Sequence, residues 1–450
     1  VIMVRDREML AQRIKEAFYI ARSGKPGPVL VDLPTDVMAE LGSTSYPTEV
    51  NIRGYKPNKG VHVGQLKKAI TLLEEAKKPM FLIGGGVNLA HAQQEMTKLA
   101  EKIDAPVITT VMGRGAISTE HPLYIGNIGM HGSYAANKTA DECDLMFSIG
   151  CRFNDRVTGE IKKFAPNAKI VHIDIESAAI SRNVTVDIPI VADAKAAILK
   201  ILEHTEPMEH KEWLDEIQGW DKEYPLQMEV KDGVNPQRII ETLNEVYADR
   251  DTVFTSDVGQ HQMWASQYLK LDATHRLVQS GGLGTMGFGL PSAVGAQIGC
   301  PEKSIVSISG DGGFQMNMQE LATAVCQELP LVNIVFNNNR LGMVRQMQEL
   351  FFKKRYTITC LRYHKSCKGK CGTPGWVCPE YVPDFVKMAE AYGTKGYFVT
   401  EDEQLRDTIL EARDYAEKNK KPVIVECMVA PDELVMPMIK GGASFEDIML

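Results

Sequence analysis

The chain has 450 residues, of which 44% are hydrophobic and 24% are charged, and its formal net charge is −8. A chain of this length is too long for one hydrophobic core and predicts two or three domains. The acidic balance argues against nucleic acid as a partner, because nucleic-acid-binding domains carry a basic surface. No apolar run of about 18 residues predicts a membrane span. The scattered cysteines and the lack of a secretory signal favour a cytoplasmic protein.

The first 40 residues predict one helix and one strand. Apolar residues recur at helical spacing from Leu10 to Ala21, and the apolar run 29–31 follows a turn rich in Gly and Pro. One helix and one strand cannot bury a core, so we expect residues 1–40 to be the C-terminal remnant of a domain whose body lies upstream. Residues 41–59 are polar and rich in turn formers, which predicts a linker.

The rest of the chain alternates between helical and strand patterns. In residues 60–205 helices are predicted near 64–76 and 90–103, and strands at 80–83, 106–109, 145–149 and 170–173. This alternation predicts an α/β protein with doubly wound parallel-sheet domains. Residues 206–235 predict a helical connector, residues 236–430 a second α/β domain, and residues 431–450 a C-terminal arm.

Two predicted strands of the last domain end in polar residues. The strand-like run 304–309 ends in Gly-Asp-Gly-Gly at 310–313, and the apolar run 331–336 ends in three asparagines at 337–339. An amphipathic helix predicted at 318–329 completes a βαβ unit, in which ligands lie beyond the C-terminal strand ends. Carboxylate and amide oxygens suit Mg²⁺ bound to phosphate, and glycines let backbone N–H groups approach a diphosphate. The pair Asp311 and Asn338 therefore predicts a Mg²⁺-diphosphate site.

Two further segments of the same domain suggest a bound ligand. Gln260 and His261 follow the predicted strand 252–254 and can donate hydrogen bonds to phosphate, although polar residues at a helix start have the same appearance. Five glycines fall in the nine positions 281–289. So many glycines disfavour a helix or a strand and indicate that the backbone here must closely approach another group.

Taken in order, these motifs resemble the large catalytic subunits of acetolactate synthase (acetohydroxyacid synthase), a thiamine-diphosphate-dependent family. The resemblance rests on Asp-Val-Gly-Gln-His-Gln-Met-Trp at 257–264, the glycine loop continued to Leu-Pro at 290–291, Gly-Asp-Gly-x-Phe-Gln-Met-Asn at 310–317 and Asn-Asn-x-x-Leu-Gly-Met-Val at 337–344. It extends over nearly the whole chain. It implies decarboxylation of pyruvate and transfer of the two-carbon unit to a second 2-ketoacid, pyruvate or 2-oxobutanoate. The products would be 2-acetolactate or 2-aceto-2-hydroxybutanoate, in branched-chain amino-acid biosynthesis.

The resemblance also implies cofactors, partners and residue roles. The cofactors are thiamine diphosphate, Mg²⁺ and FAD, and the partners are a second copy of the chain, in a homodimer or homotetramer, and a small regulatory subunit. Mg²⁺ would be held by Asp311, Asn338 and the carbonyl oxygen of Arg340. Contacts to thiamine diphosphate would come from Val258, Gly259, Gln260, His261, Gly284, Met286, Gly310, Gly312, Gly313 and Met343.

Within that set, Met286 would bend the cofactor and Met343 would also face the substrate pocket. In the middle domain, Gly84, Gly85, Arg152 and Asp193 would contact the flavin nucleotide. Arg156 would hold the carboxylate of the second ketoacid, with Met130 beside it; Arg156, Met286 and Met343 are the residues expected to act in catalysis.

Three departures from the family pattern qualify this interpretation. Met347 stands where the family has Trp, which implies a weaker preference for 2-oxobutanoate and lower sensitivity to planar herbicides. An insert at 360–382 carries Cys360, Cys367, Cys371 and Cys378, for which zinc, a redox pair and free thiols all remain open. The family's catalytic Glu belongs to the pyrimidine-binding domain, and no residue of this chain matches it.

Two alternatives remain beside acetolactate synthase. One is another thiamine-diphosphate enzyme of the same fold, such as pyruvate oxidase or glyoxylate carboligase. The other is an inactive cofactor-binding fragment, because the catalytic Glu is missing; the 450 residues alone are expected to be inactive and their full-length parent active.

Overall fold

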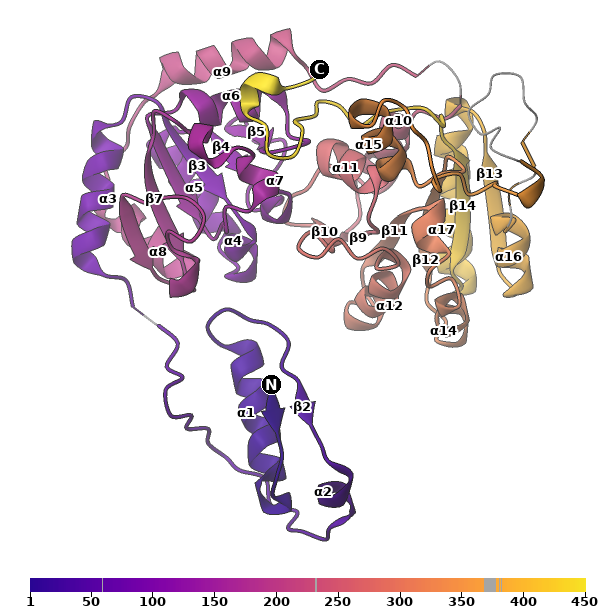
Figure 1. The fold of residues 1–450 in the computed structure, drawn as a ribbon, viewed down its shortest axis with the longest axis horizontal. Coiled ribbons are helices and arrows are strands. Elements are labelled where there is room, and N and C mark those ends of the chain that lie inside the picture. The colour runs from indigo at the N-terminus through magenta and orange to yellow at the C-terminus, as the bar shows by residue number, and fades with distance from the viewer. Residues whose placement is uncertain (59, 231–232, 368–377, 380, 382) are drawn as a thin grey trace.

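The computed structural model describes residues 1–450 apart from 59, 231–232, 368–377, 380 and 382. The N-terminal segment forms a small unit that stands apart from two α/β domains (Figure 1). It consists of β1 (Ile2–Met3), a 3-10 turn (Arg7–Met9), α1 (Leu10–Arg22), β2 (Val31–Asp32) and α2 (Thr35–Ala39). The predicted strand at 29–31 is shorter and shifted, because its only ladder is the two-residue parallel pairing of Ile2 with Val31 and Met3 with Asp32.

The middle domain is a six-stranded parallel sheet in the order β5-β4-β3-β6-β7-β8. Its strands are β3 (Pro79–Ile83), β4 (Val107–Thr109), β5 (Tyr124–Asn127), β6 (Leu145–Ile149), β7 (Lys169–Asp174) and β8 (Ile188–Val191). Its helices are α3 (Val63–Glu75), α4 (Gly85–Leu89), α5 (Gln93–Ile103), α6 (Tyr134–Glu142), α7 (Asp155–Thr158) and α8 (Ala194–His204), with short 3-10 turns at Val111–Gly113, Ile161–Lys163 and Ser177–Ala179.

Both faces of this sheet are buried, which explains the continuous apolar runs of its strands. In β3, Phe81 and Ile83 belong to the core on one face, and Met80 and Leu82 to the core on the other. The connector helix α9 (Lys211–Glu223) packs on the second face, where the indole of Trp213 donates a 3.1 Å hydrogen bond to the carbonyl of Pro79.

The second α/β domain is also a six-stranded parallel sheet, in the order β10-β9-β11-β12-β14-β13. Its strands are β9 (Thr252–Ser256), β10 (His275–Gln279), β11 (Ser304–Gly310), β12 (Leu331–Asn337), β13 (Lys395–Val399) and β14 (Val423–Met428). Its helices are α10 (Pro236–Val246), α11 (Gln260–Tyr268), α12 (Gly289–Gly299), α13 (Asp311–Phe314), α14 (Glu320–Cys326), α15 (Gly342–Phe351), α16 (Phe385–Ala391) and α17 (Leu405–Asn419), with short 3-10 turns at Lys365–Cys367 and Asp402–Gln404. A further 3-10 turn, Phe445–Asp447, belongs to the C-terminal arm and packs on α6 of the middle domain. The two sheets confirm the predicted α/β class with parallel strands.

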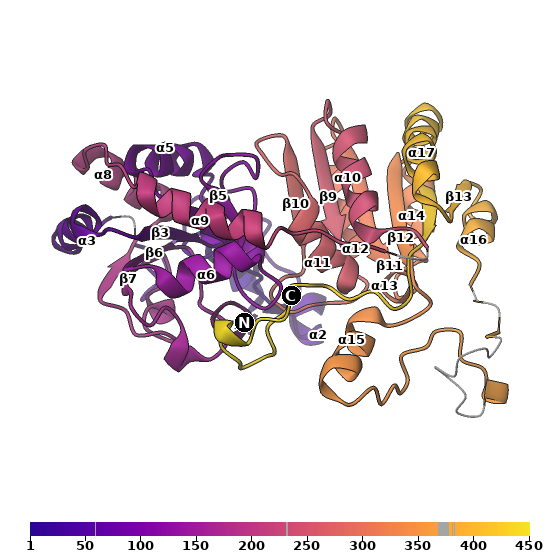
Figure 2. The same cartoon turned by 90° about the horizontal axis from the view of Figure 1, so that it is seen from above.

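An extended arm follows β14. It runs past α15 and on to the middle domain, as both views show (Figures 1 and 2). Val435 exchanges hydrogen bonds with the side chain of Gln346 on α15 at 2.8 and 3.1 Å, and the N–H of Ile439 donates to the carbonyl of Met130 at 2.8 Å. The arm therefore joins the two α/β domains by backbone contacts. In the part of the chain that the structure describes, no helix is both long and apolar enough to span a membrane.

Candidate active site

The predicted metal site forms at the C-terminal edge of the second sheet. Strands β11 and β12 pair in register from Ile305 with Leu331 to Gly310 with Phe336, so Asp311 and Asn338 follow two neighbouring strands at the same edge. The order of the sheet reverses between β9 and β11, and such a switch point opens the crevice in which α/β sheets bind ligands. The structure therefore brings the two sequence-predicted metal ligands to the position where a ligand is expected.

Asp311 is a buried carboxyl with one oxygen that the described residues leave unpaired. Its side chain is 2% exposed; Oδ1 accepts a hydrogen bond from the N–H of Gly312 at 2.8 Å, and Oδ2 is buried without a hydrogen-bond partner among the described residues. Burial raises the pKa of this carboxyl to about 7, against the opposing effect of nearby backbone N–H groups. A divalent cation would supply the missing partner for Oδ2, because carboxylate oxygen is a preferred ligand of Mg²⁺.

The asparagine turn is held by hydrogen bonds on both sides. Asn338 accepts from the N–H of Arg340 at 3.0 Å and donates to Oε1 of Gln260 at 3.2 Å. Asn337 accepts from the N–H of Asn339 at 2.9 Å and donates to the buried carboxylate of Glu426 on β14 at 2.6 Å. Gln260, which was predicted to contact diphosphate, thus lies directly beside a predicted metal ligand.

Glycines at this edge make room for neighbouring side chains. A Cβ on Gly310 would lie 2.9 Å from Nδ1 of His261, and one on Gly342 would lie 2.1 Å from Oε1 of Gln260. His261 is buried, its Nε2 has no partner within the described residues, and burial lowers its pKa to about 4. A neutral imidazole with an unused nitrogen is available to a ligand in this crevice.

The glycine loop reaches the same site. Cγ1 of Val258 lies 3.9 Å from the place a Cβ would take on Gly284, and Cε of Met286 lies 3.8 Å from the corresponding place on Gly312. Met343 and Met347 are half-buried and one turn apart on α15, which begins just after the asparagine turn. The predicted thiamine-diphosphate residues thus converge from four segments of the chain.

Met130 and Arg156 meet in the middle domain. The N–H of Met130 donates to the carbonyl of Arg156 at 3.0 Å, and the arm residue Gly441 lies against both side chains, since a Cβ there would be 3.6 Å from each. The guanidinium of Arg156 is 65% exposed, and its nearest carboxylate, Asp155, is 4.0 Å away, so it is free to bind an anion.

The residues predicted for the flavin lie at the C-terminal edge of the middle sheet. Gly84 follows β3 and Arg152 follows β6, on the two sides of the switch point, and Asp193 follows β8. Gly84 and Asp193 also have roles within the protein. A Cβ on Gly84 would lie 2.1 Å from the carbonyl oxygen of Gly150, and Asp193 caps α8 through the N–H of Ala196 at 3.0 Å. Because both residues already have a structural role, their positions do not test the predicted contacts with a flavin, which stay a prediction.

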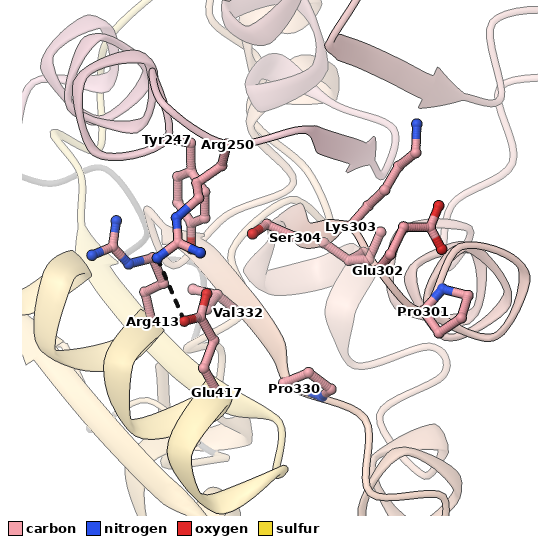
Figure 3. A pocket seen from close by; sticks show the side chains of 11 residues that line it. Tyr247, Arg250, Pro301, Glu302, Lys303, Ser304, Pro330, Val332, Arg413 and Glu417 are labelled. Carbon is pink, nitrogen blue, oxygen red and sulfur yellow. Dashed lines mark ion pairs between the residues drawn. The ribbon is translucent and has the colours of Figure 1, made fainter.

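A cavity of about 200 Å³ lies at the opposite end of the second sheet, by the first residues of β11 and β12 (Figure 3). Arg250, Arg413 and Glu417 line one side of it, with Arg250 and Glu417 paired at 3.7 Å. None of the sequence-predicted site residues is in its lining.

The cysteine insert begins beside the asparagine turn. The N–H of Leu341 donates a hydrogen bond to the carbonyl of Thr359 at 2.8 Å, and the backbones of Arg340 and Cys360 form an isolated antiparallel β-bridge. Cys360, Cys367 and Cys378 form no disulfide with one another, and Cys371 lies outside the described residues. The described residues contain no group of three His, Cys, Asp or Glu side chains that could hold a metal ion. The structure therefore adds no support for zinc here.

Three buried polar residues of the site were missed by sequence reasoning. Asp257 follows β9, Gln346 joins Gln260 to the arm, and Glu426 holds Asn337. A signal for Asp257 was available, because it follows its strand as Asp311 follows β11. Glu426 lies inside an apolar strand pattern and had no such signal.

Two family models match the chain in these two domains. Residues 66–201 match the thiamine pyrophosphate enzyme central domain, and residues 257–427 match the C-terminal TPP binding domain of the same enzymes. The fold and the site edge are therefore those of a thiamine-diphosphate (thiamine pyrophosphate) enzyme.

Comparison with known proteins shows which family of thiamine-diphosphate enzymes the chain is similar to. The chain is 40% identical to the acetolactate synthase large subunit of Corynebacterium glutamicum, over 99% of this chain and 70% of that protein. It is 39% identical to the acetolactate synthase isozyme 3 large subunit of Escherichia coli K12, over 99% and 76%. It is 40% identical to a probable acetolactate synthase large subunit of Methanocaldococcus jannaschii, over 99% and 74%. The chain belongs to the acetolactate synthase large subunit family.

Proposed function

We propose that this chain supplies the cofactor and substrate sites of an enzyme that makes acetolactate from pyruvate and a second 2-ketoacid. The observation that carries the proposal is the single edge at which Asp311, Asn338 and the predicted thiamine-diphosphate residues meet, in a chain whose relatives are acetolactate synthase large subunits. Thiamine diphosphate, when bound, supplies the carbon nucleophile that lets a 2-ketoacid lose CO₂. The protein positions the cofactor and substrate and excludes water.

In this proposal each segment of the site has one task. Asp311, Asn338 and the carbonyl of Arg340 would hold Mg²⁺ beside the diphosphate, and the orphan Oδ2 of Asp311 supports that assignment. The N–H groups of the glycine turns and the free nitrogen of His261 would contact phosphate oxygens. Met286 would support the bound cofactor.

Arg156 binds the carboxylate of the second ketoacid. A planar guanidinium can make two parallel hydrogen bonds to a carboxylate, which fixes the orientation of the acceptor as well as its position. Met130 and Gly441 border the guanidinium, so the arm closes one side of this pocket. Burial lowers the pKa of neighbouring His131 to about 4, so this imidazole adds no positive charge beside Arg156 at neutral pH.

FAD, the homo-oligomer and a small regulatory subunit belong to the same proposal. The switch point of the middle sheet, beyond the C-terminal ends of β3 and β6, suits a nucleotide. The relatives' names, which call them large subunits, support a smaller partner. We assign FAD a structural role, with pyruvate and 2-oxobutanoate as substrates and the cytoplasm as the location.

The test is product formation by the purified full-length holoenzyme, because activity is expected of it and not of the 450 residues alone. With thiamine diphosphate, Mg²⁺, FAD and pyruvate, we expect acetolactate without any added electron acceptor. A requirement for an acceptor would indicate a pyruvate oxidase, and turnover of glyoxylate in preference to pyruvate would indicate a glyoxylate carboligase. Either result would contradict the proposal.

Magnesium activation is expected to depend on pH through Asp311. The metal binds the carboxylate form, and the pKa of about 7 in the metal-free protein means that protons compete below neutrality. Between pH 8 and pH 6 the half-saturating Mg²⁺ concentration should rise about tenfold. The same titration of free thiamine diphosphate corrects for protonation of the cofactor. A corrected value that does not change with pH would contradict the assignment of Asp311 as a ligand.

Met347 is expected to set the choice of second substrate. A Met347→Trp variant should favour 2-oxobutanoate over pyruvate more strongly than the native enzyme, because a rigid ring contacts the extra methylene better than a flexible thioether does. Contact with one additional methylene changes the free-energy difference between two competing substrates by about 1–3 kcal/mol, so the product ratio should rise by about tenfold or more. A competition between the two ketoacids measures it. Met347→Leu, which keeps the volume, is the control, and equal ratios in all three proteins would contradict the role.

A further inference from the structure

Asp257 is a buried carboxylate to which no role has yet been given. It follows β9 at the switch point of the second sheet and is 1% exposed. No Lys, Arg or His nitrogen among the described residues forms an ion pair with it; burial lowers the pKa of nearby His261 more than the charge of Asp257 raises it, which leaves that imidazole neutral. Taking a carboxylate out of water without a cation is unfavourable unless hydrogen bonds to the charged form offset the cost.

Those hydrogen bonds come from the backbone of two cofactor segments. Oδ1 accepts from the N–H of Val258 at 2.7 Å and from the N–H of Gly287 at 3.1 Å. Oδ2 accepts from the N–H of Gly289 at 2.9 Å. One carboxylate therefore ties the start of the segment 258–261 to the end of the glycine loop 281–289.

A third cofactor segment packs against the same group. A Cβ on Gly313 would lie 2.3 Å from Oδ1 of Asp257, so the turn 310–313 can take its place only because residue 313 has no side chain. Gly313 was predicted to contact the cofactor; in the structure the atom nearest to its Cβ position is Oδ1 of Asp257. The three segments thus share one contact, which lies inside the protein and behind the crevice.

We propose that Asp257 is a positioning residue that fixes the glycine loop relative to the segments 258–261 and 310–313, and so sets the place of Met286 under the cofactor. Met286 immediately precedes Gly287, whose N–H donates a hydrogen bond to Asp257. The Cε atom of Met286 lies 3.8 Å from the Cβ position of Gly312. A shift of the loop would move this side chain away from the metal turn. The inference rests on the proposed seat of thiamine diphosphate.

An Asp257→Asn variant tests the role in the holoenzyme. The amide keeps the size of the side chain but turns one acceptor into a donor, which must face the N–H of Gly289 or, if flipped, the N–H groups of Val258 and Gly287. We expect the half-saturating concentration of thiamine diphosphate, measured by direct binding and by activation, to rise about 10- to 100-fold. We also expect kcat at saturating cofactor to fall, because Met286 is displaced.

The matched control is Asp272→Asn. Asp272 lies in an exposed turn before β10 and accepts backbone hydrogen bonds from Thr274 and His275 at 2.7 and 2.8 Å, so it shares the chemistry of Asp257 but not its place. Its cofactor affinity should equal that of the native protein. An Asp257→Asn variant that folds and binds thiamine diphosphate with native affinity would overturn the proposal.

Gly313→Ala keeps the test decisive if Asp257→Asn does not fold. The added methyl displaces the carboxylate without removing it, so thiamine diphosphate should again bind more weakly. In the double variant the two effects should be less than additive, because both act through one group. Native affinity in Gly313→Ala, or strict additivity, would overturn the inference. A native enzyme that binds thiamine diphosphate but makes no acetolactate would refute only the proposed function.

Discussion

Replacing Asp311 by asparagine is expected to abolish acetolactate formation while making the metal-free protein more stable. The amide has nearly the same shape but lacks the charge that Mg²⁺ requires. Loss of a contact that merely supports a metal ligand costs about 10- to 100-fold in affinity or activity, and loss of the ligand itself should exceed that. Activity at saturating Mg²⁺ and thiamine diphosphate, relative to the native enzyme, is the measurement.

The gain in stability follows from the direction of the pKa shift. Burial raises the pKa of Asp311 to about 7, so the charged form is destabilised in the folded, metal-free protein. The destabilisation is fully present above pH 7, on the order of 4 kcal/mol, and it is relieved as the pH falls from about 7 toward the pKa of the unfolded chain. The Asn variant should lack this pH dependence.

Asp384→Asn is the matched control for this experiment. Asp384 caps α16 through the N–H of Lys387 at 2.9 Å, and asparagine caps a helix as well as aspartate does. The control should keep both activity and stability. If Asp311→Asn retained substantial Mg²⁺-dependent activity, Asp311 would not be the metal ligand.

Replacing Gly84 by alanine is expected to destabilise the middle domain strongly. The backbone of Gly84 is extended, with φ −99° and ψ −179°, so alanine is not excluded by its conformation. The obstacle is space, because the new Cβ would lie 2.1 Å from the carbonyl oxygen of Gly150 and 2.6 Å from Cα of Cys151. Backbone atoms cannot rotate away as a side chain can. The loss should therefore reach or exceed about 3 kcal/mol, the upper end for overpacking.

For the same substitution at Gly219 we expect the opposite effect, a gain in stability. Gly219 lies inside α9, and a Cβ there meets nothing within 4 Å. Alanine should stabilise this helix by about 1 kcal/mol. Urea unfolding of both variants measures the difference. Equal stabilities of the two variants would contradict the close approach of Gly84 to Gly150.

The strands and the predicted metal ligands were readable from the sequence because each depends on local pattern. The apolar residues of β11 and β12 belong to cores on both faces of the sheet, and the strand ends are marked by Gly-Asp-Gly and by the asparagine run. Boundaries were less certain where the chain breaks locally. The helix predicted at 90–103 begins at Gln93, after the separate short helix α4, and the one predicted at 318–329 is confined to Glu320–Cys326.

The sequence by itself determined the alternation of helices and strands, the two sheets and the residues at the strand ends, because these follow from periodicity and from residues that terminate strands. Only the tertiary structure decided how the segments are held against one another. Asp257 connects three of them, and Gln346 connects Gln260 to the arm. These contacts join residues far apart in the chain, and their partners are mostly backbone groups, which every residue carries. No sequence pattern can mark such a partner, so the buried network behind the site became visible only in the folded protein.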